Sequence, residues 1–120
     1  MSVASPDLKV LFTRVYRGPN TWSYNPAVHL QVDLGSLEEF PTNTIPGFTD
    51  HLLEMLPGLR EHSCSRGKRG GFVERLHEGT WLGHVAEHCA LALQQVAGHD
   101  IRRGKTRQVK GQPGLYNVVF

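Results

Sequence analysis

The sequence predicts an α+β fold: a two-layer sandwich in which a mainly antiparallel sheet carries its helices on one face. Three observations lead to it. Two strand patterns open the chain, helical patterns fill its middle, and two further strand patterns close it. Strands that are grouped at the ends, rather than alternating with helices, favour antiparallel pairing over a parallel sheet. With 120 residues, the chain is expected to form one domain, residues 1–120.

The first two strands are expected to pair with each other. Lys9–Tyr16 is rich in β-branched and aromatic residues and ends at a Gly-Pro turn. Ala27–Leu34 alternates apolar and polar side chains, which is typical of a half-buried strand. The segment between them holds Trp22 and Tyr24 and is long for a hairpin, so we expect an ordered loop.

Helical patterns occupy the middle of the chain. A short helical turn is expected at Gly35–Phe40, and an amphipathic helix at Pro46–Leu56, where Pro46 suits the first helical position. Leu59–Ser65 is compatible with a third strand. A second helix is expected at Phe72–His77, after a loop rich in glycine and cations.

The longest helix pattern is Gly79–Gly98, with Gly98 suited to a left-handed cap. One apolar arc along it is expected to face the core. Its members are Trp81, Leu82, Val85, Cys89, Leu93 and Val96. Two strands are expected after this helix, a basic one at Ile101–Val109 and an apolar one at Leu115–Phe120.

The same helix carries the motif H-x-x-E-H, formed by His84, Glu87 and His88. This is the inverted zinc-peptidase motif. Histidines four residues apart lie on one side of a helix, so both imidazoles can reach one ion near the rim of a buried site. Glu87 projects about 60° from His84, so it can polarise a metal-bound water without being a ligand. The alternative is a chance pair in a chain with seven histidines.

Composition excludes several classes of protein. No apolar run is long enough to span a membrane, and the N-terminus does not resemble a secretory signal, so a cytoplasmic location is expected. Cys64 and Cys89 are expected to be reduced. A net charge of +2 does not require a polyanionic partner, and no aromatic residues interleave the basic loops, so nucleic acid is an unlikely ligand.

Several blocks of sequence, in a fixed order, resemble the N-terminal domain of cyanophycin synthetase. They are Arg17-Gly-Pro-Asn20 with Trp22-Ser23, Asn43-Thr-Ile-Pro-Gly-Phe48, Glu61-His-Ser-Cys-Ser65, Gly70-Gly-Phe-Val-Glu-Arg-Leu76, Glu78-Gly-Thr-Trp-Leu-Gly-His84 and Tyr116-Asn-Val-Val-Phe120. The resemblance runs from about Leu8 to the C-terminus. It is far more specific than the five-residue motif alone.

The resemblance implies a role with cyanophycin, a polymer with an aspartate backbone and an arginine linked to each side chain. Such a domain is expected to hold the polymer and, in some members, to cut it into primers as a metallohydrolase. The two large ATP-using synthetase domains have no counterpart in this chain, so it cannot make the polymer, and they are expected only as partners. The chain is then either an excised domain or a free-standing relative.

Two hypotheses are compatible with the sequence. In the first, zinc binds His84 and His88, and Glu87 activates its water. Glu78 is the preferred third ligand, because it lies in the loop that opens the same helix, with Glu74 and His62 as alternatives.

In the second hypothesis, the domain is a non-catalytic anchor for the polymer. Its acidic groups, Glu61, Glu74 and Glu87, pair with the guanidinium groups of the polymer, and Arg75 or Arg107 meets its free carboxylates. The family pattern has a glutamate where this chain has Ala92, in the row of residues 84, 88 and 92, which favours the anchor.

Overall fold

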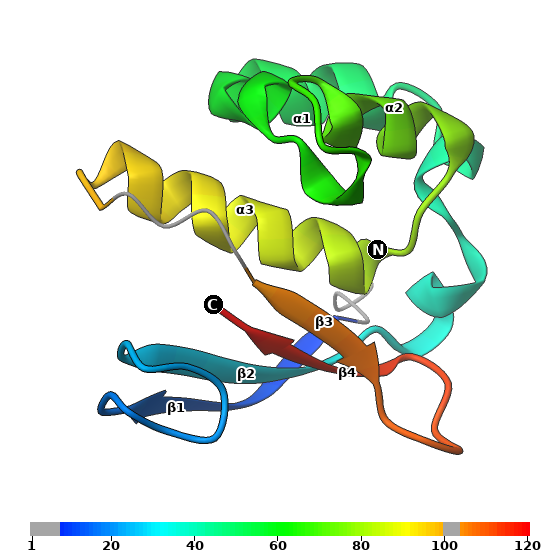
Figure 1. Cartoon of the computed structure of the whole chain (residues 1–120). Coiled ribbons are helices and arrows are strands. Elements are labelled where there is room, and N and C mark those ends of the chain that lie inside the picture. The colour runs from blue at the N-terminus through cyan, green and yellow to red at the C-terminus, as the bar shows by residue number, and fades with distance from the viewer. Residues whose placement is uncertain (1–7, 100–103) are drawn as a thin grey trace, which may run out of the picture.

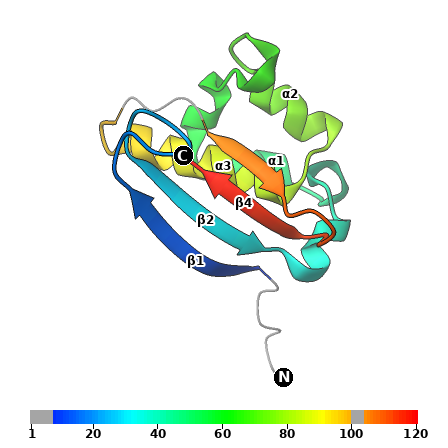
Figure 2. The same ribbon diagram turned by 60° about the horizontal axis from the view of Figure 1, so that its bottom comes forward.

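A four-stranded antiparallel sheet forms one side of the molecule (Figures 1 and 2). The structure is a computed structural model and describes residues 8–99 and 104–120. The strands are β1 (Lys9–Tyr16), β2 (Ala27–Asp33), β3 (Lys105–Gln108) and β4 (Leu115–Val119), in the spatial order β1-β2-β4-β3. Because β2 pairs with β4, a strand from the N-terminal part of the chain and one from the C-terminal part lie side by side in the middle of the sheet.

The loop between β1 and β2 is ordered, as expected. The side chain of Asn20 accepts hydrogen bonds from the backbone N–H groups of Trp22 and Ser23, at 2.8 and 2.9 Å. Its amide group donates to the carbonyls of Arg17 and Asn25. One polar side chain therefore closes the loop on itself.

The three α-helices lie on one face of the sheet, which confirms the α+β sandwich. They are α1 (Phe48–Met55), α2 (Gly71–Glu78) and α3 (Leu82–Val96). Figure 1 shows α3 lying across the sheet, with α1 and α2 on the far side of α3. The helical part is thus two helices deep, and α3 is in contact with neighbours on two sides.

Short 3₁₀ helices connect these elements. They are η1 (Gly35–Glu39), η2 (Thr42–Thr44), η3 (Pro57–Glu61) and η4 (Cys64–Arg66). The helical turn expected after β2 is confirmed by η1. The strand expected at Leu59–Ser65 is wrong, because η3 and η4 occupy that segment. Leu59 is fully buried in the helical layer, so the segment packs against helices instead of reaching the sheet.

The apolar core is divided by α3 into two clusters. The one in the helical layer consists of Leu52, Leu53, Leu59, Phe72, Leu76, Val85 and Ala92. The one between α3 and the sheet consists of Val32, Leu34, Tyr116 and Val118. Leu82, at the start of α3, packs against both.

The apolar arc expected along α3 is only partly buried. Trp81, Leu93 and Val96 are 46%, 57% and 80% exposed. A single apolar arc suits a helix that packs on one side only. In contrast, α3 packs against the sheet on one side and against the helical layer on the other. On the side towards the sheet, Gly83 lies against the ring of Tyr116, and the C-terminal turn of α3 extends beyond α1 and α2 (Figure 1).

Other boundaries differ by a few residues. The helix expected from Pro46 begins at Phe48, because Gly47 precedes it in a left-handed conformation with φ of 70°. The left-handed cap at Gly98 is confirmed, with φ of 95°. The basic strand covers Lys105–Gln108, and residues 101–103 of its expected range lie outside the described residues. In the described part of the chain, no helix has the length and apolar character that crossing a membrane requires.

Candidate metal centre and its cleft

An open cleft of about 1360 Å³ lies between the helical layer and the β3 edge of the sheet. Its walls come from the η3–η4 segment, α2, α3 and β3. Among the lining residues are Cys64, Arg75, His84, Glu87, His88 and Arg107. The residues of the H-x-x-E-H motif therefore share one cavity.

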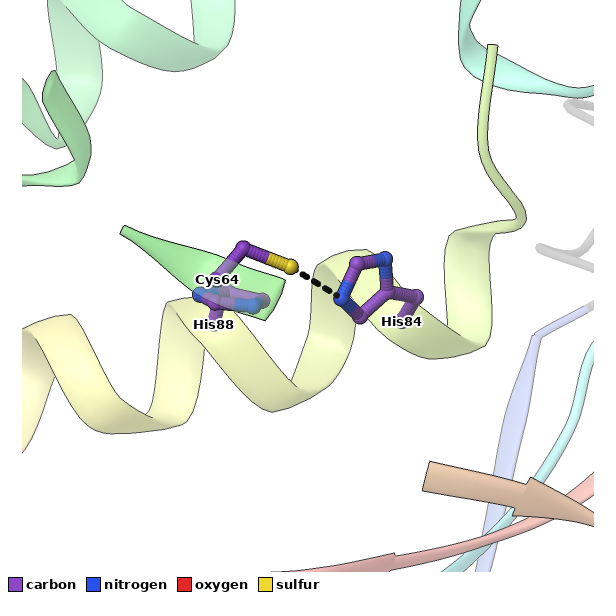
Figure 3. A group of neighbouring side chains, drawn as sticks. All are labelled: Cys64, His84 and His88. Carbon is purple, nitrogen blue, oxygen red and sulfur yellow. Dashed lines mark hydrogen bonds between the residues drawn. The ribbon is translucent and has the colours of Figure 1, made fainter. Parts of the chain in front are cut away.

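Three possible metal ligands converge in this cleft: Cys64, His84 and His88. Their ligand atoms all lie within 4.8 Å of one another. Figure 3 shows the thiol of Cys64 directed at the ring of His84, with His88 one turn further along α3. Cys64 Sγ lies 3.4 Å from His84 Nε2. Two imidazoles and a thiol are donors that zinc prefers, so this set fits a zinc ion.

Hydrogen bonds hold both imidazoles in position. The Nδ1 atom of His84 lies 3.0 Å from Thr80 Oγ1. The Nδ1 atom of His88 lies 2.9 Å from Nδ1 of His62, and Nε2 of His62 lies 3.1 Å from the side-chain oxygen of Gln95. In the tautomer in which His62 donates to that amide oxygen through Nε2, its Nδ1 accepts the hydrogen bond and His88 donates through Nδ1. Nε2 of His88 then carries the lone pair that a metal needs.

Burial keeps both histidines neutral. The pKa of His84 is lowered to about 4, first by burial and then by the charge of Arg75. The pKa of His88 is lowered to about 3 by burial and by the neighbouring His84 and His62. Metals bind the neutral imidazole. Both rings are therefore available as ligands at neutral pH.

Phe72 of α2 supports both histidine rings. It is fully buried. It stacks on His88, with ring centroids 3.9 Å apart and 18° between the planes. It also meets the ring of His84 edge-on at 5.5 Å. Phe72, which belongs to the helical layer, thus restricts the movement of both imidazole rings.

Threonines fix where α3 begins, and hence where His84 lies. Thr42 of η2 donates a hydrogen bond to the carbonyl of Leu76 in α2, at 2.8 Å. It accepts one from the backbone N–H of Thr80, at 3.0 Å. Both threonines are buried. The end of α2 and the start of α3 are therefore tied to one side chain.

Glu87 lies on the sheet side of α3. It is buried, and it accepts a hydrogen bond from the hydroxyl of Thr106 in β3, at 2.5 Å. Burial raises the pKa of its carboxyl group, and the Thr106 hydrogen bond opposes that shift. Glu87 thus lines the cleft from α3 beside β3, whereas Cys64 lines it from η4.

Residues 29–120 match the model of a protein family that is described as the cyanophycin synthase-like N-terminal domain. This chain belongs to that family. The cyanophycin synthetases of Geminocystis herdmanii and Crocosphaera subtropica are each 49% identical to it over 115 residues, and that of Synechocystis sp. is 47% identical. Each alignment covers 94% of this chain and 13% of the relative. The chain is therefore a cyanophycin-related domain that spans a small part of these relatives.

Glu78, the third ligand expected from the sequence, does not join the cluster of this family member. It is exposed and forms an ion pair with Arg66 at 2.7 Å. That ion pair lowers the pKa of its carboxyl group. The alternative Glu74 pairs with Lys68. His62, the other alternative, forms a hydrogen bond with the candidate ligand His88.

Sequence reasoning missed Cys64. The residue lies in Glu61–Ser65, one of the blocks that carries the family resemblance, and cysteine is a common zinc ligand. A cysteine inside such a block could therefore have been predicted as a metal ligand. It was hidden because the segment was interpreted as a strand, which would have carried Cys64 away from the helices. The turn that brings it to His84 places Cys64 itself at φ of 53°.

Ala92 belongs to the apolar cluster of the helical layer and is 3% exposed. The row of residues 84, 88 and 92 therefore leaves the cleft after His88 and continues into the core. Gln95, further along α3, supplies the polar contact to His62 instead. The contacts of His84 and His88 in this chain do not depend on a carboxylate at position 92.

Proposed function

We propose that this domain binds cyanophycin in the cleft and cuts it by metal-dependent hydrolysis. The observation that carries the proposal is the convergence of Cys64, His84 and His88 in a cleft that Glu87 also lines. Membership of a family named for cyanophycin supplies the polymer as the substrate class. Cutting would leave short chains that can serve as primers.

Cys64, His84 and His88 are the residues that would hold the ion. Their donor set, their neutral imidazoles and the hydrogen bonds at both Nδ1 atoms support zinc. When bound, zinc supplies a Lewis acid that polarises a carbonyl group and lowers the pKa of water. This set replaces the pair of histidines with Glu78 as the working hypothesis, because Glu78 pairs with Arg66.

Glu87 is the residue proposed to accept and return the proton. A general base works best when its pKa lies close to the operating pH, and burial moves the pKa of Glu87 in that direction. The hydroxyl of Thr106 restrains one carboxylate oxygen. The other oxygen is then the one proposed to take the proton.

The cleft also has the charges that a zwitterionic polymer requires. Arg69, Arg75, Lys105 and Arg107 line it together with Glu61 and Glu87. Arginine side chains of the polymer would meet the acidic groups, and its free carboxylates would meet the cations.

The second candidate is a non-catalytic anchor. It is favoured by the position of Glu87, whose carboxylate bonds to β3 and is not among the hydrogen-bond partners of the two histidines. In that function the same cleft holds the polymer without cutting it.

Metal analysis combined with a cleavage assay tests the proposal. The purified protein should take up close to one equivalent of zinc, and Cys64→Ala, His84→Ala and His88→Ala should each lose it. Glu78→Gln is the matched control and should keep it. Wild type incubated with cyanophycin should release short soluble fragments that mass spectrometry detects. Glu87→Gln should keep both zinc and polymer while turnover falls about a hundred- to ten-thousand-fold.

The two candidate functions give different results. A protein that stays metal-free in excess zinc would eliminate the hydrolase and leave the anchor. If wild type binds zinc but releases no fragments, catalysis is eliminated while the metal site and the anchor are kept. Failure to bind cyanophycin at all would remove both.

A further inference from the structure

Arg75 is a cation in the cleft that the protein leaves largely unpaired. It lies on α2, three residues after Phe72, and lines the cleft. Its Nε atom is buried and has no hydrogen-bond partner. Its Nη2 atom donates to Thr80 Oγ1 over a long distance of 3.5 Å. A guanidinium group has five N–H donors, so this one hydrogen bond leaves most of its capacity unused.

Nearby carboxylates do not supply the missing partner. The described residues form three ion pairs, Arg66–Glu78, Lys68–Glu74 and Arg69–Glu61, and Arg75 is in none of them. Of the two acidic residues that line the cleft, Glu61 binds Arg69 and Glu87 binds Thr106. The carboxyl group of Glu78 feels the charge of Arg75, but it forms its ion pair with Arg66. A partly buried cation without a direct ion pair is costly to the fold, and a bound anion would offset that cost.

Arg75 also lies next to the metal ligands. Thr80 Oγ1, which receives the hydrogen bond from Arg75, is 3.0 Å from Nδ1 of His84. One hydroxyl group therefore separates the guanidinium from a ligand ring. The charge of Arg75 is also felt at His84, where it lowers the imidazole pKa. An anion bound to Arg75 would therefore lie close to His84, with only the Thr80 side chain between them.

We infer that Arg75 forms a carboxylate-binding subsite beside the Cys64–His84–His88 cluster, which takes the free carboxylate of an arginine unit of the polymer. The inference rests on the proposed binding of cyanophycin in the cleft, but it does not require hydrolysis. Guanidinium groups bind carboxylates through two parallel hydrogen bonds, which fix orientation as well as position. Arg75 is then a specificity residue that orients the polymer against the cluster.

The test compares two small probes on protein stripped of metal by a chelator, so that no carboxylate can bind an ion. One probe is aspartate with arginine linked to its side chain, and the other is the same molecule with the arginine carboxyl group converted to a carboxamide. Wild type should bind the carboxylate probe about tenfold or more tightly than the carboxamide, by calorimetry or by titration of NMR signals. Arg75→Gln should bind both alike, and Arg75→Lys should keep part of the preference.

Arg60→Gln is the control, since Arg60 lies exposed on η3 and does not line the cleft. It should keep the preference of wild type. Thermal unfolding provides a second readout: because Arg75 has little bonding within the protein and its partial burial is costly, Arg75→Gln should melt at or above the temperature of wild type.

Three results would overturn the subsite. They are a wild type that binds the probes equally or not at all, a preference that survives in Arg75→Gln, and a large fall in melting temperature with equal loss of both probes. A protein that prefers the carboxylate but cuts no polymer would remove the hydrolase and leave the subsite in place.

Discussion

At the scale of single residues, α3 buries two neutral imidazoles that ordinarily carry a proton in mild acid. His84 and His88 have pKa values of about 4 and about 3, against 6.5 when unburied. Below pH 6.5 the unfolded chain therefore binds protons that the folded chain does not. The stability that these two rings contribute is complete above pH 6.5 and is lost as the pH falls towards 4 and 3.

We expect the free energy of unfolding of the metal-free protein to fall by up to about 1.4 kcal/mol per pH unit for each of these histidines between pH 6 and 4. Urea unfolding in chelator across that range measures the slope. His88→Leu should flatten it, whereas replacing the exposed His51 of α1 should not. An unchanged slope in His88→Leu would show that the ring already carries its proton in the fold.

Glu87 should respond to pH in the opposite sense. Its pKa is raised by burial, so the fold favours the protonated form, and the charged form destabilises the fold above the folded-state pKa. That penalty disappears as the pH falls below the unfolded value of 4.5. Gln is neutral and can still accept the hydrogen bond from Thr106.

Glu87→Gln should therefore melt at a higher temperature than wild type at pH 7 to 8, and the difference should vanish near pH 4. Thermal unfolding at several pH values tests this. A variant less stable than wild type at neutral pH would mean that the Thr106 hydrogen bond outweighs the burial of charge. Together with lost turnover, greater stability would be typical of a residue kept for function.

At the scale of elements, α3 reaches the sheet closely because of one glycine. A Cβ atom on Gly83 would lie 2.7 Å from the ring of Tyr116 in β4. Tyr116 is itself held, since its hydroxyl donates to Glu38 of η1 at 2.6 Å. The ring therefore has little freedom to move away from an added methyl group.

Gly83→Ala should destabilise the protein by about 1–3 kcal/mol, although alanine ordinarily stabilises a helix relative to glycine. Gly58 of η3 is the matched control, because a Cβ there meets nothing within 4 Å. Gly58→Ala should be neutral or slightly stabilising. Denaturant unfolding of both variants compares them, and a stable Gly83→Ala would mean that α3 can shift away from the sheet.

At the scale of the whole molecule, the cleft depends on two layers meeting. Cys64 belongs to the helical layer, Arg107 to the sheet, and His84 and Glu87 to the helix between them. Charged groups of both signs line the resulting cavity. A polymer with guanidinium and carboxylate groups would make mostly ionic contacts there.

Binding of cyanophycin should therefore weaken several-fold as salt rises from about 0.05 to 0.5 M, because screening shortens the range of these interactions. Affinity measured across that range, with the metal removed, tests the expectation without any contribution from catalysis. Binding that is independent of salt would indicate apolar contacts and would point away from the charged cleft.

Local pattern was enough to predict most of the elements. Alternation indicated β2, and β-branched composition indicated β1, because half-buried strands show these signals within a few residues. The long helix and its H-x-x-E-H motif were also predictable, since a repeat of four residues brings His84 and His88 to one side of a helix whatever surrounds it. The family was recognisable from short blocks whose order alone is specific.

Tertiary structure decided the rest. Packing on two sides buries Glu87, and the overhang of the last turn of α3 leaves Val96 exposed, whereas a helical arc predicts one buried face along the whole helix. Cys64 meets His84 across twenty residues of sequence, after a turn that sequence reasoning took for a strand. Arg75 forms no ion pair because the acids around it are engaged elsewhere. Such facts depend on which distant groups become neighbours, and no local period in the sequence records that.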